Sequence, residues 1–239
     1  MTESITVSTG HTFELPVSLS ATIAGAVFSA DRSAVEELLP AGLEPVGTRA
    51  DRAAMTVLVV RYDRVGRETI PPYDEVGVLF PAVEAGTRTV PYLSVFRRPA
   101  SGYVHTLPVT TEPARAFGVD VWGYPKLVAT IDVTDEGRTR RATVTTGKGT
   151  LVSVSIRRPP TVPARLSGYN LTVKDDELLR EPTSLRGRVG GWFGGDGASL
   201  SFGEHPIGRQ LQGVDVGERP LLRLAADCEF TIGAGEPVG

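Results

Sequence analysis

The chain contains very little cysteine, histidine or lysine. Its 239 residues include one cysteine and three histidines, and only three of its 25 basic residues are lysines. The lone Cys228 excludes an intrachain disulfide and any CxxC motif, so we expect a reducing, cytoplasmic location. The histidines, at 11, 105 and 205, are far apart, which argues against a zinc site. We expect neither a metal nor a cofactor.

Long hydrophobic runs and basic blocks are also missing. No run of 18 apolar residues occurs, and the first ten residues lack the basic and apolar segments of a signal peptide. The formal net charge is −3, and no basic block exceeds a dipeptide. We therefore expect a small-molecule partner and neither nucleic acid nor membrane.

What remains is typical of a globular chain with a substantial core. Hydrophobic residues make up 41% of the sequence and charged residues 22%. No linker separates two halves, so we expect a single domain over residues 1–239, with loose ends at 1–15 and 234–239. No period of 20–50 residues repeats, which excludes solenoids and propellers.

Alternating apolar and polar residues dominate the pattern and favour strands. Asp135-Glu136-Gly137 has the composition of a hairpin turn. The prediction is a mainly β (α+β) protein with a mostly antiparallel sheet. The expected strands are 21–30, 54–64, 74–85, 89–98, 127–136, 140–147, 150–158 and 220–233.

Helical signals are few and short. Asp31 can cap a helix that stops at Pro40, and a second helix is expected over 111–123, where Thr111 precedes Glu-Pro. A third is expected within 202–214. The glycine-rich segment 184–200 predicts a flexible loop or lid between strands, and whether its part 187–197 closes over the site stays open.

Three apparent motifs do not hold. The segment 145–150, TTGKGT, lacks the first glycine of a phosphate-binding loop and a following helix, so it indicates a hairpin turn. The glycines of 190–197 lack the strand and helix of a dinucleotide site. No serine lies in the G-x-S-x-G pattern of a hydrolase.

One lysine has apolar and aromatic neighbours in the sequence. Lys126 lies in VWGYPKLVA (121–129), between Tyr124-Pro125 and Leu127, in a chain that otherwise prefers arginine. A free lysine has a pKa near 10.4, and burial among apolar groups can lower a lysine pKa by roughly 3–5 units. A neutral lysine can condense with a ketone or oxo acid, and the iminium stabilises an adjacent carbanion. The alternative is a lysine whose stem merely covers apolar surface.

Several segments together resemble acetoacetate decarboxylases. The segment 111–127, TEPARAFGVDVWGYPKL, is similar to the family's active-site helix, which runs into an aromatic-Pro-Lys. The segment 72–82, PYDEVGVLFPA, resembles the one that carries an active-site glutamate. Looser similarity extends from about residue 20 to 232 and includes 28–45, 103–114 and 203–211.

The resemblance implies a fold and a site. The fold would be a curved, cone-like antiparallel β-barrel with a few peripheral helices, assembled into a homo-oligomer. Lys126 would be the Schiff-base lysine and Glu75 the acid that moves protons or positions substrate. The expected pocket also contains Tyr124, Trp122, Tyr73, His105 and Leu127. His105, on the strand-like segment 102–109, is otherwise expected to be a structural hydrogen-bonding residue.

The departures from the family favour a different reaction. True decarboxylases carry a second lysine where this chain has Leu127, and 20–24 and 55–60 lack the family's arginine and second glutamate. We therefore expect aldolase or dehydratase chemistry on a small oxo acid or oxo compound, as in natural-product pathways. Three alternatives stay open: a β-keto acid decarboxylase, a non-covalent cyclase or isomerase, and a ligand-binding barrel with a decayed site.

Overall fold

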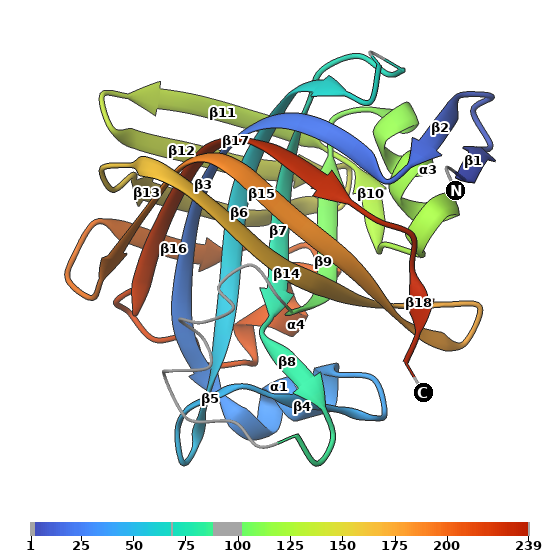
Figure 1. The fold of residues 1–239 in the computed structure, drawn as a ribbon. Coiled ribbons are helices and arrows are strands. Elements are labelled where there is room, and N and C mark those ends of the chain that lie inside the picture. The colour runs from blue at the N-terminus through green and yellow to red at the C-terminus, as the bar shows by residue number, and fades with distance from the viewer. Residues whose placement is uncertain (1–2, 68, 88–101, 239) are drawn as a thin grey trace.

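A ring of seven strands forms the body of the protein. The computed structural model describes residues 3–67, 69–87 and 102–238. Around the ring the strands run β9, β14, β15, β17, β3, β6 and β7, and β7 pairs with β9 to close it (Figure 1). Only the contact between β9 and β14 is parallel. The bounds are β3 Val17–Asp31, β6 Arg52–Val65, β7 Tyr73–Phe80, β9 Gly102–Val109, β14 Val162–Lys174, β15 Glu177–Phe193 and β17 Leu222–Ile232.

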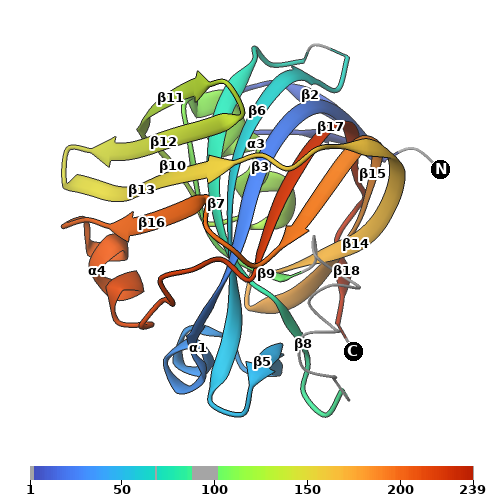
Figure 2. The ribbon, with the colours of Figure 1, turned by 90° about the vertical axis from the view of Figure 1, so that its left-hand side faces the viewer.

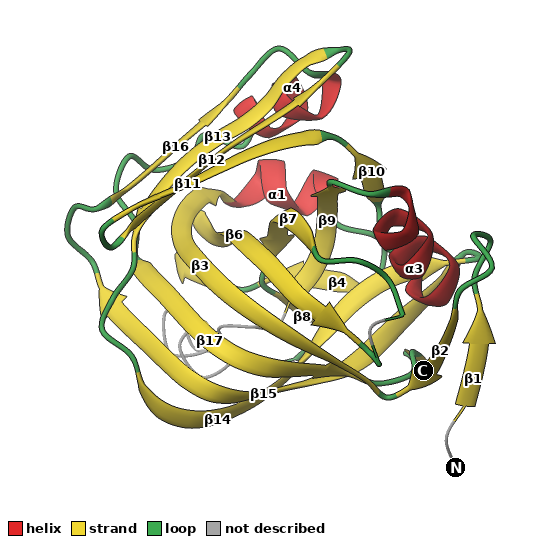
Figure 3. Cartoon of the chain, turned by 90° about the horizontal axis from the view of Figure 1, so that it is seen from above, coloured by secondary structure: helices red, strands yellow, loops and turns green. Residues whose placement is uncertain are grey.

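A second sheet packs on the outside of this ring. Its four antiparallel strands are β11 Thr130–Glu136, β12 Thr139–Thr146, β13 Gly149–Arg157 and β16 Ala198–Phe202. Figures 2 and 3 show it as a separate layer beside β6 and β7. Buried side chains of both layers, among them Phe28, Met55 and Ile156, form one core, whereas another core lies within the ring around Phe117 and Trp122. Side chains alternate along each ring strand, so one face of the strand packs into the core within the ring and the other into the core under the outer sheet.

Three helices lie at the periphery of the described structure: α1 Arg32–Leu38, α3 Glu112–Trp122 and α4 Pro206–Gln212. The Asp31 carboxylate accepts a hydrogen bond from the Ala34 amide at 2.9 Å, as the sequence predicts for this cap. Thr111 caps α3 in the same way, and Gly123 ends it with φ at 72°. That left-handed turn, which glycine adopts without a steric penalty, sends the chain back toward the ring.

Shorter strands complete the fold. They are β1 Glu3–Thr6, β2 Thr12–Leu15, β4 Leu43–Pro45, β5 Gly47–Arg49, β8 Ala82–Glu84, β10 Lys126–Val128 and β18 Glu236–Pro237. β1 pairs with β2, and β18 pairs with β15. Backbone groups near both ends of the described chain therefore have hydrogen-bond partners in these ladders.

The barrel implied by the resemblance is confirmed, and all predicted strands within the described residues overlap observed ones. The segment TTGKGT is the turn between β12 and β13, where Thr146 pairs with Gly149. The predicted strand 89–98 lies outside the described residues.

The prediction of a flexible loop or lid at 184–200 is wrong. Residues up to Phe193 continue β15, and Ala198 begins β16. The glycines serve close backbone approach: a Cβ at Gly187 would overlap the Asp227 carbonyl oxygen, and one at Gly190 the Pro160 carbonyl oxygen. Only the short turn between these strands has glycines with positive φ, namely Gly194, Gly195 and Gly197.

Among the described residues, no helix is both long enough and apolar enough to cross a membrane.

Candidate active site

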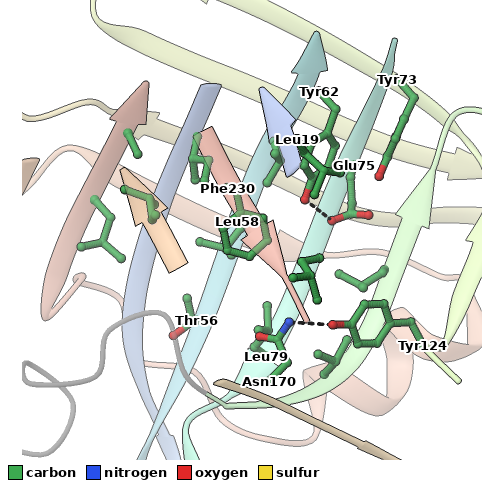
Figure 4. A pocket seen from close by; sticks show the side chains of 18 of the residues that line it. Leu19, Thr56, Leu58, Tyr62, Tyr73, Glu75, Leu79, Tyr124, Asn170 and Phe230 are labelled. Atoms are coloured by element: carbon green, nitrogen blue, oxygen red, sulfur yellow. Dashed lines mark hydrogen bonds between the residues drawn. The ribbon is translucent and has the colours of Figure 1, made fainter. Parts of the chain in front are cut away.

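A cavity of about 120 Å³ lies inside the ring. Its walls come from the inward-facing residues of β3, β6, β7, β9, β14, β15 and β17, together with α3 and the segment that follows it. Leucine, valine, isoleucine and aromatic side chains make up most of the lining. Figure 4 shows Glu75, Tyr62, Tyr73, Tyr124 and Asn170 among these walls.

Lys126 and Glu75 meet in this cavity. Lys126 Nζ donates a hydrogen bond to Glu75 Oε2 at 2.7 Å. The two side chains are 4% and 7% exposed, so this is a buried ion pair and not a surface one. Fifty-one positions separate them in sequence, and the closure of β7 against β9 brings them together. A contact this short allows a proton to pass directly between amine and carboxylate.

The local backbone directs the lysine inward. After Gly123, Tyr124 and Pro125 lead into β10, which pairs in parallel with β9 so that Lys126 lies opposite Leu107. Residues that alternate along a strand face opposite sides. Lys126 accordingly enters the cavity, while Leu127 packs against the core under the outer sheet.

Gly118 leaves room for the lysine stem. A Cβ at this position of α3 would overlap Lys126 Cε and lie 2.6 Å from Cδ. The helix therefore passes against the lysine with no side chain between them, and this contact holds the amine at Glu75.

Replacing Gly118 with alanine is expected to displace the amine without unfolding the chain. A shift of about 1 Å at a reacting group can lower a rate by about a hundredfold, and we expect a loss of that order in imine trapping. Mass spectrometry of borohydride-treated protein gives the rate, and circular dichroism checks the fold. Gly147→Ala is the control, since a Cβ there meets no atom within 4 Å. Equal trapping by both variants would contradict this role.

Two tyrosines frame the ion pair. Tyr62 donates a long hydrogen bond of 3.4 Å to Glu75 Oε1, and Lys126 Nζ lies 5.3 Å from the centre of the Tyr73 ring. Burial, followed by the nearby charge of Glu75, raises the pKa of Tyr62 and of Tyr73 well above the ordinary value. Both hydroxyls therefore stay protonated and can donate hydrogen bonds.

A third tyrosine presents a hydroxyl from another wall. Asn170 Nδ2 donates to the Tyr124 hydroxyl at 2.8 Å, which orients that oxygen and leaves its own proton for another acceptor (Figure 4). Burial raises the pKa of Tyr124 strongly. Trp122 stacks on Tyr124 at 5.4 Å and donates from Nε1 to the Gly233 carbonyl oxygen at 2.9 Å. Trp122 thus helps to fix the position of Tyr124.

Five of the seven predicted site residues line the cavity: Lys126, Glu75, Tyr124, Trp122 and Tyr73. His105 and Leu127 do not. The His105 ring packs on Phe80 at 5.2 Å and bonds to Gln210 of α4, on the side of the outer sheet. His105 follows Val104 and Leu127 follows Lys126. Both preceding residues line the cavity, so His105 and Leu127 face away from it. Burial lowers the pKa of His105, in keeping with a structural position.

Sequence reasoning missed Asn170, Tyr62 and a second buried carboxyl group, Glu181. Glu181 is 0% exposed, and neither of its side-chain oxygens has a hydrogen-bond partner among the described residues. It lies opposite Asn170 in the β14–β15 ladder. Burial raises its pKa from 4.5 to about 9, so it is a neutral acid at physiological pH. The signal in the sequence was its position in the buried phase of an alternating strand.

The described part of the chain contains no group of three or more histidine, cysteine, aspartate or glutamate residues that could hold a metal ion.

The closed ring of strands is consistent with the family to which the comparisons assign this chain. A family model described as acetoacetate decarboxylase matches residues 5–238. The chain belongs to the acetoacetate decarboxylase family. No curated protein matches it significantly in sequence.

Solved structures agree in fold at low sequence identity. An acetoacetate decarboxylase from Legionella pneumophila is 14% identical with a TM-score of 0.66, covering 94% of this chain and 87% of that one. The enduracididine biosynthesis enzyme MppR, in complex with pyruvate, is 13% identical with a TM-score of 0.70, covering 94% and 90%. An acetoacetate decarboxylase-like enzyme from Sphingomonas wittichii is 14% identical with a TM-score of 0.60, covering 93% and 92%.

Proposed function

We propose that the protein is a lyase in which Lys126 forms an imine with the carbonyl carbon of an oxo compound. The observation that carries this proposal is the 2.7 Å contact between Lys126 Nζ and Glu75 Oε2, buried in an apolar cavity. Family membership supports it, as does the structure of the similar MppR with pyruvate.

Glu75 supplies and receives the protons of imine formation. Transfer of one proton from Lys126 Nζ to Glu75 leaves a neutral amine, which attacks the carbonyl carbon. The carbonyl oxygen then leaves as water, taking one proton from the nitrogen and one from Glu75. The product is the protonated imine, which draws electrons from the adjacent carbon. Glu75 is then ionised beside that carbon and can remove a proton from it.

The tyrosines hold the oxygen atoms of the substrate. Tyr124 has a free hydroxyl proton because Asn170 donates to its oxygen, and Tyr62 and Tyr73 stand on either side of Glu75. A carbanion adjacent to an iminium can add to a second carbonyl, whose oxygen then takes a proton from Glu75. The adduct loses water when Glu75 removes a second proton from the same carbon and gives it to the departing hydroxyl. We favour this aldolase or dehydratase sequence over decarboxylation, since Leu127 and the apolar walls that the structure describes place no second cation near the amine.

Reductive trapping tests the proposal. The wild-type protein, mixed with a panel of ketones, aldehydes and oxo acids and then with borohydride, is expected to gain the mass of one reduced adduct. Peptide mapping is expected to place it on Lys126. Lys126→Met should abolish the adduct, and Glu75→Gln should slow trapping by about a hundredfold or more through loss of acid–base catalysis.

The chain offers a clean control because it has only three lysines. Lys148→Met, in the exposed turn between β12 and β13, should trap as the wild type does. Labelling of Lys148 or Lys174 in place of Lys126, or no adduct with any carbonyl of the panel, would refute imine chemistry. Full turnover by Lys126→Met would instead indicate a non-covalent cyclase or isomerase.

A further inference from the structure

We propose that the cavity accepts a neutral carbonyl compound with a hydrocarbon body, such as a medium-chain methyl ketone or an oxo ester, in preference to a free oxo acid. The inference names the substrate class of the imine site and so builds on the function proposed for Lys126. It rests on the distribution of charge and apolar surface in the walls.

The described lining of the cavity contains one cation and one anion, and they are bound to each other. Of its 24 described lining residues, only Glu75 and Lys126 carry a formal charge. A substrate carboxylate would need a cation or several hydrogen-bond donors to replace its hydration. The single cation is already paired at 2.7 Å, and no lining arginine is present among the described residues.

Strand alternation turns the nearby arginines outward. Arg165 precedes the lining residue Leu166 on β14 and is exposed. Arg223 precedes Leu224 on β17 and donates to the Arg157 carbonyl oxygen on the outer sheet at 2.9 Å. Because neighbouring residues of a strand face opposite sides, none of these guanidinium groups can reach a bound ligand without a change of register.

Charge balance in the intermediate leads to the same conclusion. An iminium on Lys126 carries one positive charge and Glu75 one negative charge, so a neutral substrate gives a neutral site. An oxo acid adds a second carboxylate next to Glu75 in an apolar enclosure, where like charges repel and water is largely excluded. The neutral compound avoids both costs.

The walls away from the amine fit a hydrocarbon. Glu75, Tyr62 and Tyr73 gather on one side of the cavity in Figure 4, while Leu58 and Phe230 lie toward the other. Beyond them the lining continues with leucine and valine side chains of β14, β15 and β17. The pocket is therefore amphipathic: polar groups stand at Glu75 and at the Tyr124–Asn170 pair, and most of the remaining lining is apolar.

Trapping with matched carbonyl pairs tests the inference. Methyl acetoacetate and acetoacetate differ by a charge at nearly constant shape, and we expect the ester to half-saturate labelling at a concentration at least about tenfold lower. Methyl ethyl, methyl butyl and methyl hexyl ketones form a second series. Each added methylene should lower the half-saturating concentration by about fourfold until the cavity is full. Equal or better labelling by the free acid, or no chain-length dependence, would overturn the inference.

A cation placed in the wall should reverse the preference. Leu166→Arg puts a guanidinium on the cavity side of β14, whereas Ser167→Arg puts the same group on its outer, exposed face. We expect acetoacetate labelling to improve by about tenfold in the first variant relative to the second. An equal response of both variants would count against the inference.

A direct binding measurement separates this inference from the imine proposal. Calorimetry of the wild-type protein with methyl octanoate and with octanoate compares the same acyl chain with and without a charge, and an ester carbonyl forms no imine with Lys126. Binding of the ester but not of octanoate supports the inference even if no carbonyl is ever trapped, a result that would refute the imine alone. Binding of octanoate as tightly as the ester would refute the inference even if Lys126 labels normally.

Discussion

Replacing Glu181 with glutamine is expected to raise the free energy of unfolding on the order of 5 kcal/mol at about pH 8. The pKa of Glu181 is raised by burial from 4.5 to about 9. Between those values the folded chain holds a proton that the unfolded chain has lost, so stability falls as pH rises. The slope from this one group is about 1.4 kcal/mol per pH unit. A glutamine side chain does not titrate, so the pH dependence of stability that comes from this position disappears.

Urea unfolding at several pH values measures this effect. The stability gained by Glu181→Gln should vanish near pH 4.5. Below that pH the Glu181 carboxyl is protonated in both the folded and the unfolded state, so the wild type keeps its full stability. Glu177→Gln, an exposed position on the same strand, is the control and should change little at any pH. A wild-type slope that persists in Glu181→Gln would show that Glu181 is not the buried acid responsible.

Removing either member of the Lys126–Glu75 pair is expected to cost about 3–5 kcal/mol of stability near neutral pH, because the remaining charge is buried without a partner. The side chains are 4% and 7% exposed, so water cannot replace the lost contact. Lys126→Met together with Glu75→Leu should be less destabilised than either single variant, since both charges are then gone.

The coupling energy from this double-mutant cycle is the decisive measurement. The exposed helical pair Arg32–Glu36, joined at 2.8 Å, is the control and should show a coupling of about 0.5 kcal/mol or less. Additive effects of the Lys126 and Glu75 substitutions would show that the two side chains do not interact in solution.

The sequence indicated Lys126 for a physical reason. Its neighbours on both sides are apolar or aromatic, and arginine, which this chain prefers elsewhere, cannot form an imine. Glu75, Tyr73, Trp122 and Tyr124 followed from resemblance and line the cavity with it. The error at His105 and Leu127 came from sequence proximity, since both lie within three positions of lining residues but face the opposite side of their strands.

Glu181 and Asn170 were hidden by the same property of strands. Each comes from a segment for which the sequence predicts no strand, with Arg180 and Pro182 on either side of Glu181 and Gly168 before Tyr169 and Asn170. Whether a polar residue in an alternating strand faces inward depends on the phase of the whole strand, and that phase becomes definite only when its partner is known. The glycines of β15 led to the wrong prediction of a loop for a similar reason. Their close backbone contacts with β17 and with Pro160 cannot be inferred from the neighbouring sequence.

By itself the sequence determined the mainly β architecture, the capped helices and the presence of one lysine suited to imine chemistry. Those features follow from alternation, capping side chains and local composition, all of which act over a few residues. The tertiary structure alone decided that Lys126 meets Glu75 and that Glu181 is buried without a partner. It also decided that the arginines of the ring face outward. Strand order and register fix these three facts, and both depend on contacts between residues far apart in the chain.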